Sequence, residues 1–226
     1  MSYLVFVSYL VRVTHLPRVN NNAGYHYLTP TQETIMKVVA FNGSPRKNGN
    51  TAMLIDMVAA ELEKEGIEVE RVQLGGRLLH GCTACMKCFQ NKNGHCAVTS
   101  DSMNELIEKL VEADGIIIGS PTYFCSVTTE VKALIDRAGL VAIANGRVLK
   151  RKVGAAVVAV RRAGASNVFD TINKFFFINE MIVPGSIYWN LAIGREPGEV
   201  AGDDEGVRTM QHLGENMAWL MKRVRE

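Results

Sequence analysis

No segment of the chain has the roughly eighteen consecutive apolar residues that a membrane-spanning helix needs, so we expect no membrane attachment. Charge of one sign is also scarce, because the formal net charge is only +2. This balance argues against a nucleic-acid or anionic-membrane partner that is recruited by bulk charge. Internal repeats and low-complexity tracts are absent as well. The chain has 47% hydrophobic and 21% charged residues, which is the composition of a globular protein that can bury a sizeable core.

Residues 1–35 differ from the rest of the chain, but we expect them to be a poor secretory signal. The stretch "SYLVFVSYLVRV" is apolar but short, with no basic residue before it and no small-residue cleavage site after it. The polar stretch "NNNAGYHYLTPTQET" that follows predicts a linker. We therefore expect a cytoplasmic protein with an N-terminal extension (1–35) and one domain (36–226). The extension is either without function or an added arm that packs on a neighbouring subunit.

From Lys37 onward, apolar runs typical of strands alternate with amphipathic helical patterns. Strands are predicted at 37–43, 67–74, 115–121 and 152–160, with a fifth inside 181–189 that is broken at Pro184–Gly185. Helices are predicted at 51–66, 100–114, 127–139, 167–179 and over the stretch that carries Val207 to Val224. This alternation predicts βαβ units and an α/β fold with a doubly wound parallel sheet in the flavodoxin-like order 2-1-3-4-5.

Two helix ends carry specific signals. Gly66 is a predicted C-terminal cap of the first helix. Ser102 and Glu105 have the spacing of a capping box at the start of the helix within 100–114. Its apolar stripe is predicted to consist of Met103, Leu106, Ile107, Leu110 and Val111.

The loop after the first strand, "NGSPRKNGNT" (42–51, the first loop), is neither a P-loop nor a G-x-G-x-x-G turn. It nevertheless joins a strand end to a helix start, where backbone N–H groups and the helix dipole favour an anion. We predict a phosphate-monoester site with donors Ser44, Asn48, Asn50 and Thr51 and the cation Arg46. The alternative is a plain turn in which Asn50 or Thr51 caps the helix.

Four of the five cysteines lie in "GCTACMKCFQNKNGHC" (81–96, the thiol segment), within a predicted insertion at 80–98. Disulfides are disfavoured without a secretory signal. Structural zinc is disfavoured because three cysteines at i, i+3 and i+6 crowd one turn. A [4Fe–4S] cluster spreads its ligand sites more widely and suits a compact Cys-x2-Cys-x2-Cys run with one distant cysteine. We favour the cluster, leaving zinc or unoccupied thiols open, with ligands Cys82, Cys85, Cys88 and Cys96; the flanking His80 and His95 are expected on the surface.

The combination of "GSPRKNGNT", "GCTACMKC" and "GSPTYFCSVTTEVKALIDRAG" resembles the family of NADPH-dependent FMN reductases and multimeric flavodoxins. The thiol segment resembles the iron–sulfur flavoprotein branch of that family. The resemblance runs from about Lys37 to the end of the chain. It implies that FMN is held by its phosphate in the first loop. It also implies that the flavin ring lies against the second loop (120–126), at Pro121, Thr122, Tyr123 and Phe124, with a third loop (160–166) nearby. Cys125 is expected to be a buried small hydrophobe.

No acid–base dyad or nucleophilic triad is evident, so we predict no catalytic side chain and assign the chemistry to the cofactors. The predicted function is a flavoprotein oxidoreductase containing FMN and [4Fe–4S] that couples one-electron carriers to two-electron donors or acceptors. One alternative is a cluster-free NAD(P)H-dependent reductase of FMN or quinones, and another is a non-catalytic flavodoxin-like carrier or zinc-stabilised binding module. Expected partners are a ferredoxin-like protein or a small-molecule donor such as NAD(P)H, and the resemblance implies a homodimer or homotetramer.

Overall fold

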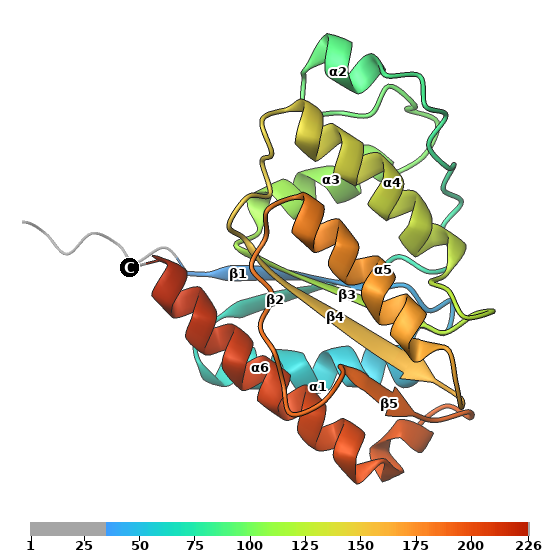
Figure 1. Cartoon of the computed structure of the whole chain (residues 1–226), viewed down its shortest axis with the longest axis vertical. Coiled ribbons are helices and arrows are strands. Elements are labelled where there is room, and N and C mark those ends of the chain that lie inside the picture. The colour runs from blue at the N-terminus through green and yellow to red at the C-terminus, as the bar shows by residue number, and fades with distance from the viewer. Residues whose placement is uncertain (1–34, 226) are drawn as a thin grey trace, which may run out of the picture. The chain divides into compact units, whose positions relative to one another are not determined.

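Five parallel strands form the centre of the fold, in the order β2-β1-β3-β4-β5 (Figure 1). They are β1 (Lys37–Asn42), β2 (Glu68–Gln73), β3 (Gly115–Pro121), β4 (Val153–Val160) and β5 (Leu191–Ile193). The structure is a computed structural model that describes residues 35–225, so the predicted extension at 1–35 lies outside the described residues apart from Ile35. The sheet confirms the predicted flavodoxin-like α/β fold and its strand order.

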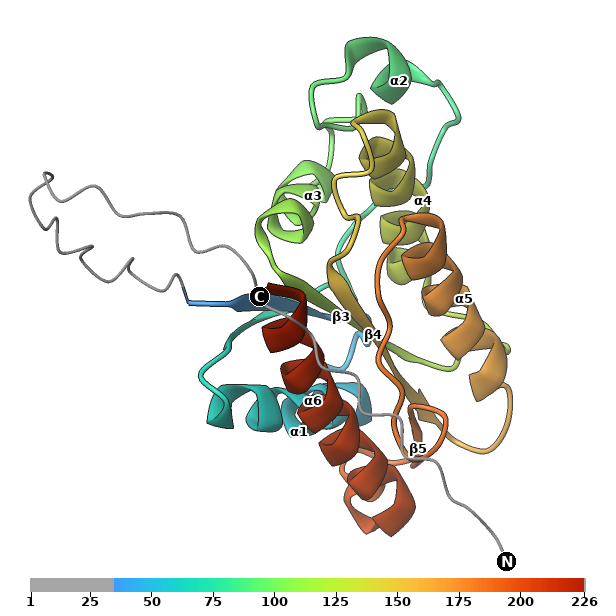
Figure 2. The same cartoon turned by 60° about the vertical axis from the view of Figure 1, so that its left-hand side comes forward.

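Helices cover both faces of the sheet, as Figures 1 and 2 show. On one face lie α1 (Asn50–Lys64) and α6 (Asp204–Arg225), and on the other lie α3 (Met103–Glu112), α4 (Thr129–Ala144) and α5 (Ala165–Ile178). Two short elements lie in connections, α2 (Lys87–Asn91) and the 3-10 helix η1 (Glu199–Gly202). Within residues 35–225, no helix combines the length and the apolar character needed to cross a membrane.

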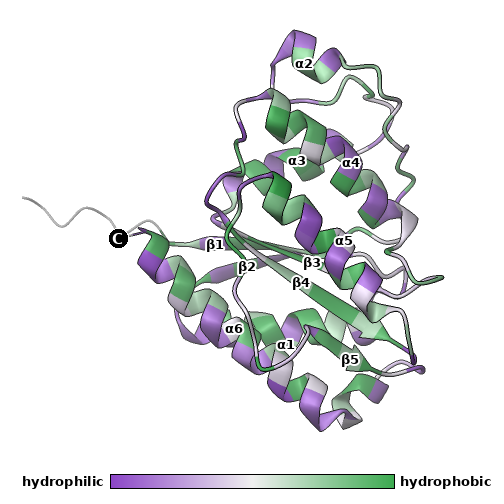
Figure 3. Cartoon of the chain, in the orientation of Figure 1, coloured by the Kyte–Doolittle hydropathy of each residue, from purple (hydrophilic) through white to green (hydrophobic). Residues whose placement is uncertain are grey.

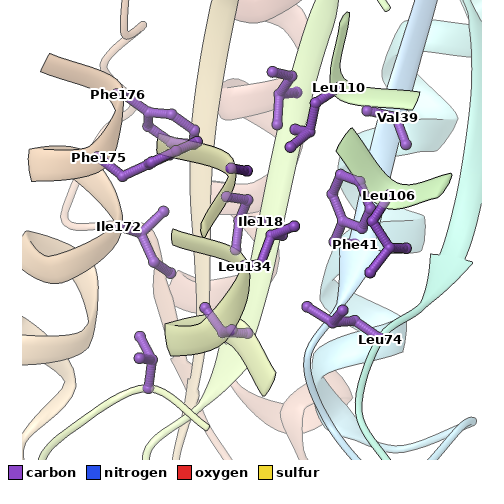
Figure 4. Packing of buried hydrophobic residues seen from close by; sticks show 14 of the residues in the cluster. Val39, Phe41, Leu74, Leu106, Leu110, Ile118, Leu134, Ile172, Phe175 and Phe176 are labelled. Atoms are coloured by element: carbon purple, nitrogen blue, oxygen red, sulfur yellow. The ribbon is translucent and has the colours of Figure 1, made fainter. Parts of the chain in front are cut away.

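The core consists of two apolar layers, one on each face of the sheet. Ile116 and Ile118 of β3 face α3, α4 and α5, whereas Ile117 between them faces α1 and α6. This alternation follows from the period of two along a strand, and all three side chains are fully buried. Figure 3 shows β3 and β4 in green along much of their length, and Figure 4 shows side chains of β1, β3, α3, α4 and α5 packed together in the layer that contains Ile118. A strand buried on both faces is therefore apolar throughout, as the sequence indicated.

The fifth strand is not where the sequence predicted it. It lies at Leu191–Ile193, beside Val158–Val160 of β4, and within 181–189 only Ile182 makes an isolated bridge, to Val153. Pro184 cannot donate to a strand ladder, so the apolar stretch around it runs along the molecule as a strap.

Of the two helix ends, one is confirmed and one is corrected. Gly66 follows α1 with a positive φ of 77°, as a C-terminal glycine does. The capping box at α3 is not formed: Ser102 Oγ accepts from Arg77 (3.1 Å), and the Met103 N–H is taken by Asp101 Oδ1 (3.2 Å). The apolar stripe is also narrower than predicted, because Val111 is exposed.

Candidate flavin and thiol sites

A cavity of about 250 Å³ lies at the carboxyl ends of the strands, where β1, β3, β4 and β5 lead into their loops. Its lining residues come from the first and second loops and from the segments after β4 and β5: Ser44, Arg46, Asn50, Thr51, Pro121, Thr122, Tyr123, Ala159, Arg161, Gly194 and Arg195. The structure thus brings together seven of the nine cofactor-binding residues predicted from the sequence. This position is where doubly wound sheets bind ligands.

The first loop is fixed by hydrogen bonds that leave its inner groups available. Asn42 Oδ1 accepts from the Ser44 N–H (3.1 Å), and Ser44 Oγ accepts from the Arg46 N–H (3.2 Å). Ser44 and Thr51 are buried. Helix α1 begins after Gly49 with no side-chain cap from the described residues and no acidic residue in its first turn. The free N–H groups of that turn and the positive end of the helix dipole therefore favour an anion.

Two predicted donors in the first loop serve other purposes. Asn50 lines the cavity, but its Nδ2 donates to Glu196 O (3.0 Å) and its Oδ1 accepts from the Gly198 N–H (2.8 Å). Its amide thus braces the segment after β5. Asn48 does not line this cavity. It lines a neighbouring cavity, together with Lys47 and Arg71.

The second loop forms a tight hairpin turn. Tyr123 and Ser126 exchange two backbone hydrogen bonds, and the residues between them, Phe124 and Cys125, have positive φ angles of 47° and 59°. Both lie at the exposed tip, so Phe124 does not line the cavity and the expectation that Cys125 is buried was wrong. Below the tip, Thr122 Oγ1 is buried with no hydrogen-bond partner among residues 35–225. A buried hydroxyl without a partner is costly, so this atom points to a ligand.

The four thiols of the thiol segment line one small cavity of about 20 Å³, together with Arg137 of α4. Cys88 is buried, Cys96 is half-buried, and Cys82 and Cys85 are exposed; none of the five cysteines forms a disulfide. Among the described residues, no three His, Cys, Asp or Glu side chains are grouped so as to hold a single metal ion. In Figure 1 the segment containing α2 lies beyond α3 and α4, at the top of the picture.

The thiols differ in acidity. The Lys87 N–H and the Thr83 hydroxyl lower the pKa of Cys85, whereas burial raises the pKa of Cys88. Of the flanking histidines, His80 is exposed, and His95 Nε2 lies 2.9 Å from Glu108 Oε1 of α3.

Arg137 anchors the thiol segment to α4, a role that the sequence did not reveal. Its side chain is fully buried and bonds Asp101 Oδ2 (2.5 Å), His80 O (3.0 Å), Val98 O (2.8 Å) and Cys96 Sγ (3.3 Å). Burial alone would raise the pKa of Asp101, but hydrogen bonds from Arg137 and from the N–H groups of His80 and Met103 hold that pKa below its ordinary value.

Asp101 should make stability depend on pH in acid. Because its folded pKa is depressed, its contribution is complete above the ordinary carboxyl pKa of about 3.9 and is lost as the pH falls through the folded value. In urea denaturation, wild type should exceed Asp101→Asn in free energy of unfolding at pH 7, and this gap should shrink below about pH 4. A gap that stays constant down to pH 2.5, on the order of one unit below the ordinary value, would contradict the assignment.

Two further cavities lack the chemistry expected of a redox site. One of about 220 Å³ between α3 and α4 is lined almost wholly by apolar atoms. Another of about 200 Å³ lies at the opposite, amino ends of the strands, beside Lys152 and Met36. Neither combines the open start of a helix with a buried unpartnered hydroxyl, as the cavity at the carboxyl ends does.

Comparison with known proteins identifies the family. The sequence profile of the NADPH-dependent FMN reductases matches residues 36–196. The chain belongs to the NADPH-dependent FMN reductase family. An iron–sulfur flavoprotein of Methanocaldococcus jannaschii is 37% identical over 198 residues, which cover 84% of this chain and all of that protein. An iron–sulfur flavoprotein of Methanosarcina thermophila is 34% identical and covers 70% of this chain and 84% of its own length.

Solved structures of lower identity share the fold. The crystal structure of RosB with the bound intermediate 8-demethyl-8-formylriboflavin-5′-phosphate has a TM-score of 0.67 at 24% identity, over 84% of this chain and 80% of that one. A flavodoxin from the Archaea has a TM-score of 0.52 at 17% identity, over 85% of this chain and 100% of that one. As a member of the FMN reductase family with iron–sulfur flavoprotein relatives, the chain is a flavin-dependent oxidoreductase.

Proposed function

We propose that the 250 Å³ cavity binds FMN and that the thiol segment binds a [4Fe–4S] cluster, so that the protein couples one-electron carriers to two-electron donors or acceptors. The observation that carries the flavin assignment is the unpartnered, buried Thr122 Oγ1 in a cavity that also contains the open start of α1. When bound, FMN would exchange one or two electrons and the cluster would exchange single electrons.

The residues present fit FMN at two ends of the cavity. Ser44 Oγ, Thr51 Oγ1 and the first-turn N–H groups of α1 would donate to the phosphate, and Arg46 would neutralise its charge. Pro121, Thr122 and Tyr123 would contact the ring, with Thr122 Oγ1 as a polar contact. The described residues that line the cavity include no carboxylate, histidine or thiol. The chain would therefore bind and orient the cofactor and exclude water, without an acid or base of its own.

The four cysteines also fit a cluster. Cys82, Cys85, Cys88 and Cys96 line one cavity, and four thiolates are the ligand set of a [4Fe–4S] cubane. The relatives named iron–sulfur flavoproteins support this assignment. Arg137 would hold Cys96 in place and place a positive charge beside its sulfur.

The charges around the thiol segment favour an acidic protein carrier. Residues 72–100 contain no carboxylate, while Lys87 and Lys92 are exposed. An acidic one-electron carrier such as a ferredoxin would be attracted to this surface. NAD(P)H is the proposed two-electron donor, and a homodimer or homotetramer is the proposed assembly.

A cluster-free NAD(P)H-dependent reductase is the second candidate function. It is favoured by the absence, among residues 35–225, of three ligands already grouped around one point. The two candidates differ in a property that can be measured directly, the iron content of protein purified without oxygen.

Cys85→Ala is expected to abolish or halve the iron content while leaving FMN bound. Anaerobically purified wild type should contain on the order of four irons and four sulfides per chain together with one FMN. The variant removes one ligand, and Cys125→Ala is the matched control because that thiol lies outside the thiol segment. Iron, sulfide and flavin assays provide the measurement. Wild-type protein with flavin but no iron would select the second candidate.

A further inference from the structure

We propose that Arg161 forms a second anion subsite in the flavin cavity, which takes a phosphate or carboxylate group of the two-electron co-substrate. The inference rests on the proposed function, because the co-substrate must meet a bound flavin.

The backbone holds Arg161 at the mouth of the cavity. It is the first residue after β4, and the carbonyls of the last two β4 residues tie down both neighbouring loops. Ala159 O accepts from the Thr122 N–H and Val160 O accepts from the Gly194 N–H, each at 2.9 Å. Arg161 is therefore carried by a rigid strand end between the second loop and the segment after β5, and its exposed side chain lines the cavity.

The cavity carries more positive charge than one FMN phosphate requires. Three arginines line it, and no carboxylate does among the described residues. Arg46 belongs to the first loop, at the start of α1, and Arg195 Nε lies 3.2 Å from Glu196 Oε1. The guanidinium of Arg161 makes no ion pair or hydrogen bond within residues 35–225. A phosphate monoester has a charge of roughly −2 at neutral pH, which Arg46 and the N–H groups of α1 already match.

The two unpaired arginines are also set apart by the sheet. Arg46 follows β1 and Arg161 follows β4, and β3 lies between these strands. Because neighbouring strands are about 4.8 Å apart, the two strand ends are separated by roughly 10 Å. The two arginines thus belong to loops that follow different strands, and a planar guanidinium can bind either phosphate or carboxylate through two parallel hydrogen bonds.

The test uses FMN-loaded protein and two small probes, inorganic pyrophosphate and succinate, titrated by calorimetry and by the flavin absorbance. Wild type should bind at least one probe. A preference for pyrophosphate would indicate a phosphate group on the co-substrate, and a preference for succinate would indicate a carboxylate group. Arg161→Gln should weaken that binding by about tenfold or more, the effect of losing a charge-assisted hydrogen bond. Arg162→Gln is the matched control, since Arg162 is adjacent but does not line the cavity, and it should change binding less than about twofold.

A parallel FMN titration of the apoprotein separates the possible failures. Arg46→Gln should weaken FMN binding, whereas Arg161→Gln should leave it within about twofold of wild type. Equal losses of FMN affinity in both variants would show that Arg161 serves the FMN phosphate and would overturn the subsite. Two results would overturn the subsite and leave the proposed function intact. One is a wild type that binds FMN but neither probe, and the other is an equal loss of probe binding in Arg161→Gln and Arg162→Gln. Wild type that fails to bind FMN would overturn the proposed function together with the subsite.

Discussion

Arg137→Met is expected to lower the free energy of unfolding by about 3–5 kcal/mol, because it leaves the buried Asp101 carboxylate without its cation. The side chains of both partners are at most 1% exposed, so solvent cannot replace the lost interaction. The same change removes the bonds to His80 O, Val98 O and Cys96 Sγ that fasten the thiol segment to α4. Iron loading should therefore fall sharply, while FMN binding in the separate 250 Å³ cavity should persist.

The matched control lies on the same helix. Lys132→Met removes an exposed ion pair with Asp136 and should change the free energy of unfolding by no more than about 0.5 kcal/mol. Arg137→Met/Asp101→Leu should recover part of the loss, since a buried ion pair can be replaced by apolar side chains. Urea denaturation followed by circular dichroism measures all three. An Arg137→Met protein as stable as Lys132→Met would show that the buried pair does not anchor the segment.

Gly75→Ala is expected to weaken FMN binding by at least about tenfold and to cost about 1–3 kcal/mol of stability, as overpacking against fixed atoms does. A methyl group at this position would lie 2.3 Å from Ser44 C, 2.4 Å from Ser44 O and 2.6 Å from Gly43 O. These are backbone atoms of the first loop and cannot rotate away. The loop must shift, and with it the proposed phosphate donors.

Gly185→Ala is the control for this change, because a methyl group there meets no atom within 4 Å. Fluorescence titration with FMN and urea denaturation should separate the two alanine variants clearly. Gly75→Ala protein that binds FMN as tightly as wild type would mean that the first loop is not where the phosphate binds.

Local sequence patterns were sufficient to predict the central strands of the sheet, but not to place the strand at its edge. The apolar runs of β3 and β4 exist because both faces of those strands are buried, so the pattern reports the environment directly. The stretch 181–189 is just as apolar, yet it forms a strap, because Pro184 interrupts the ladder and Leu191–Ile193 takes the position beside β4. Apolar character alone does not distinguish these two outcomes.

The site residues show the same division. Ser44 and Thr51 were predicted because they lie where a strand end leads into a helix start, and Thr122 was predicted from the family resemblance. Asn48 was grouped with them by sequence proximity, but the turn closed by Gly49 N–H to Arg46 O carries it to the neighbouring cavity. Arg161 lies in the third loop (160–166), which was expected near the flavin, but no role was predicted for its side chain. Arg137 could not have been found, because its burial comes from the thiol segment 41 residues earlier.

The amide of Asn50 joins parts of the polypeptide that are synthesised far apart in time. Its two hydrogen bonds reach partners 146 and 148 positions later in the chain. Contacts of such long sequence separation form late in folding, because the entropy of closing a large loop is lost before the contacts can offset it. A nascent chain should therefore acquire its affinity for flavin only after the segment following β5 has left the ribosome and docked.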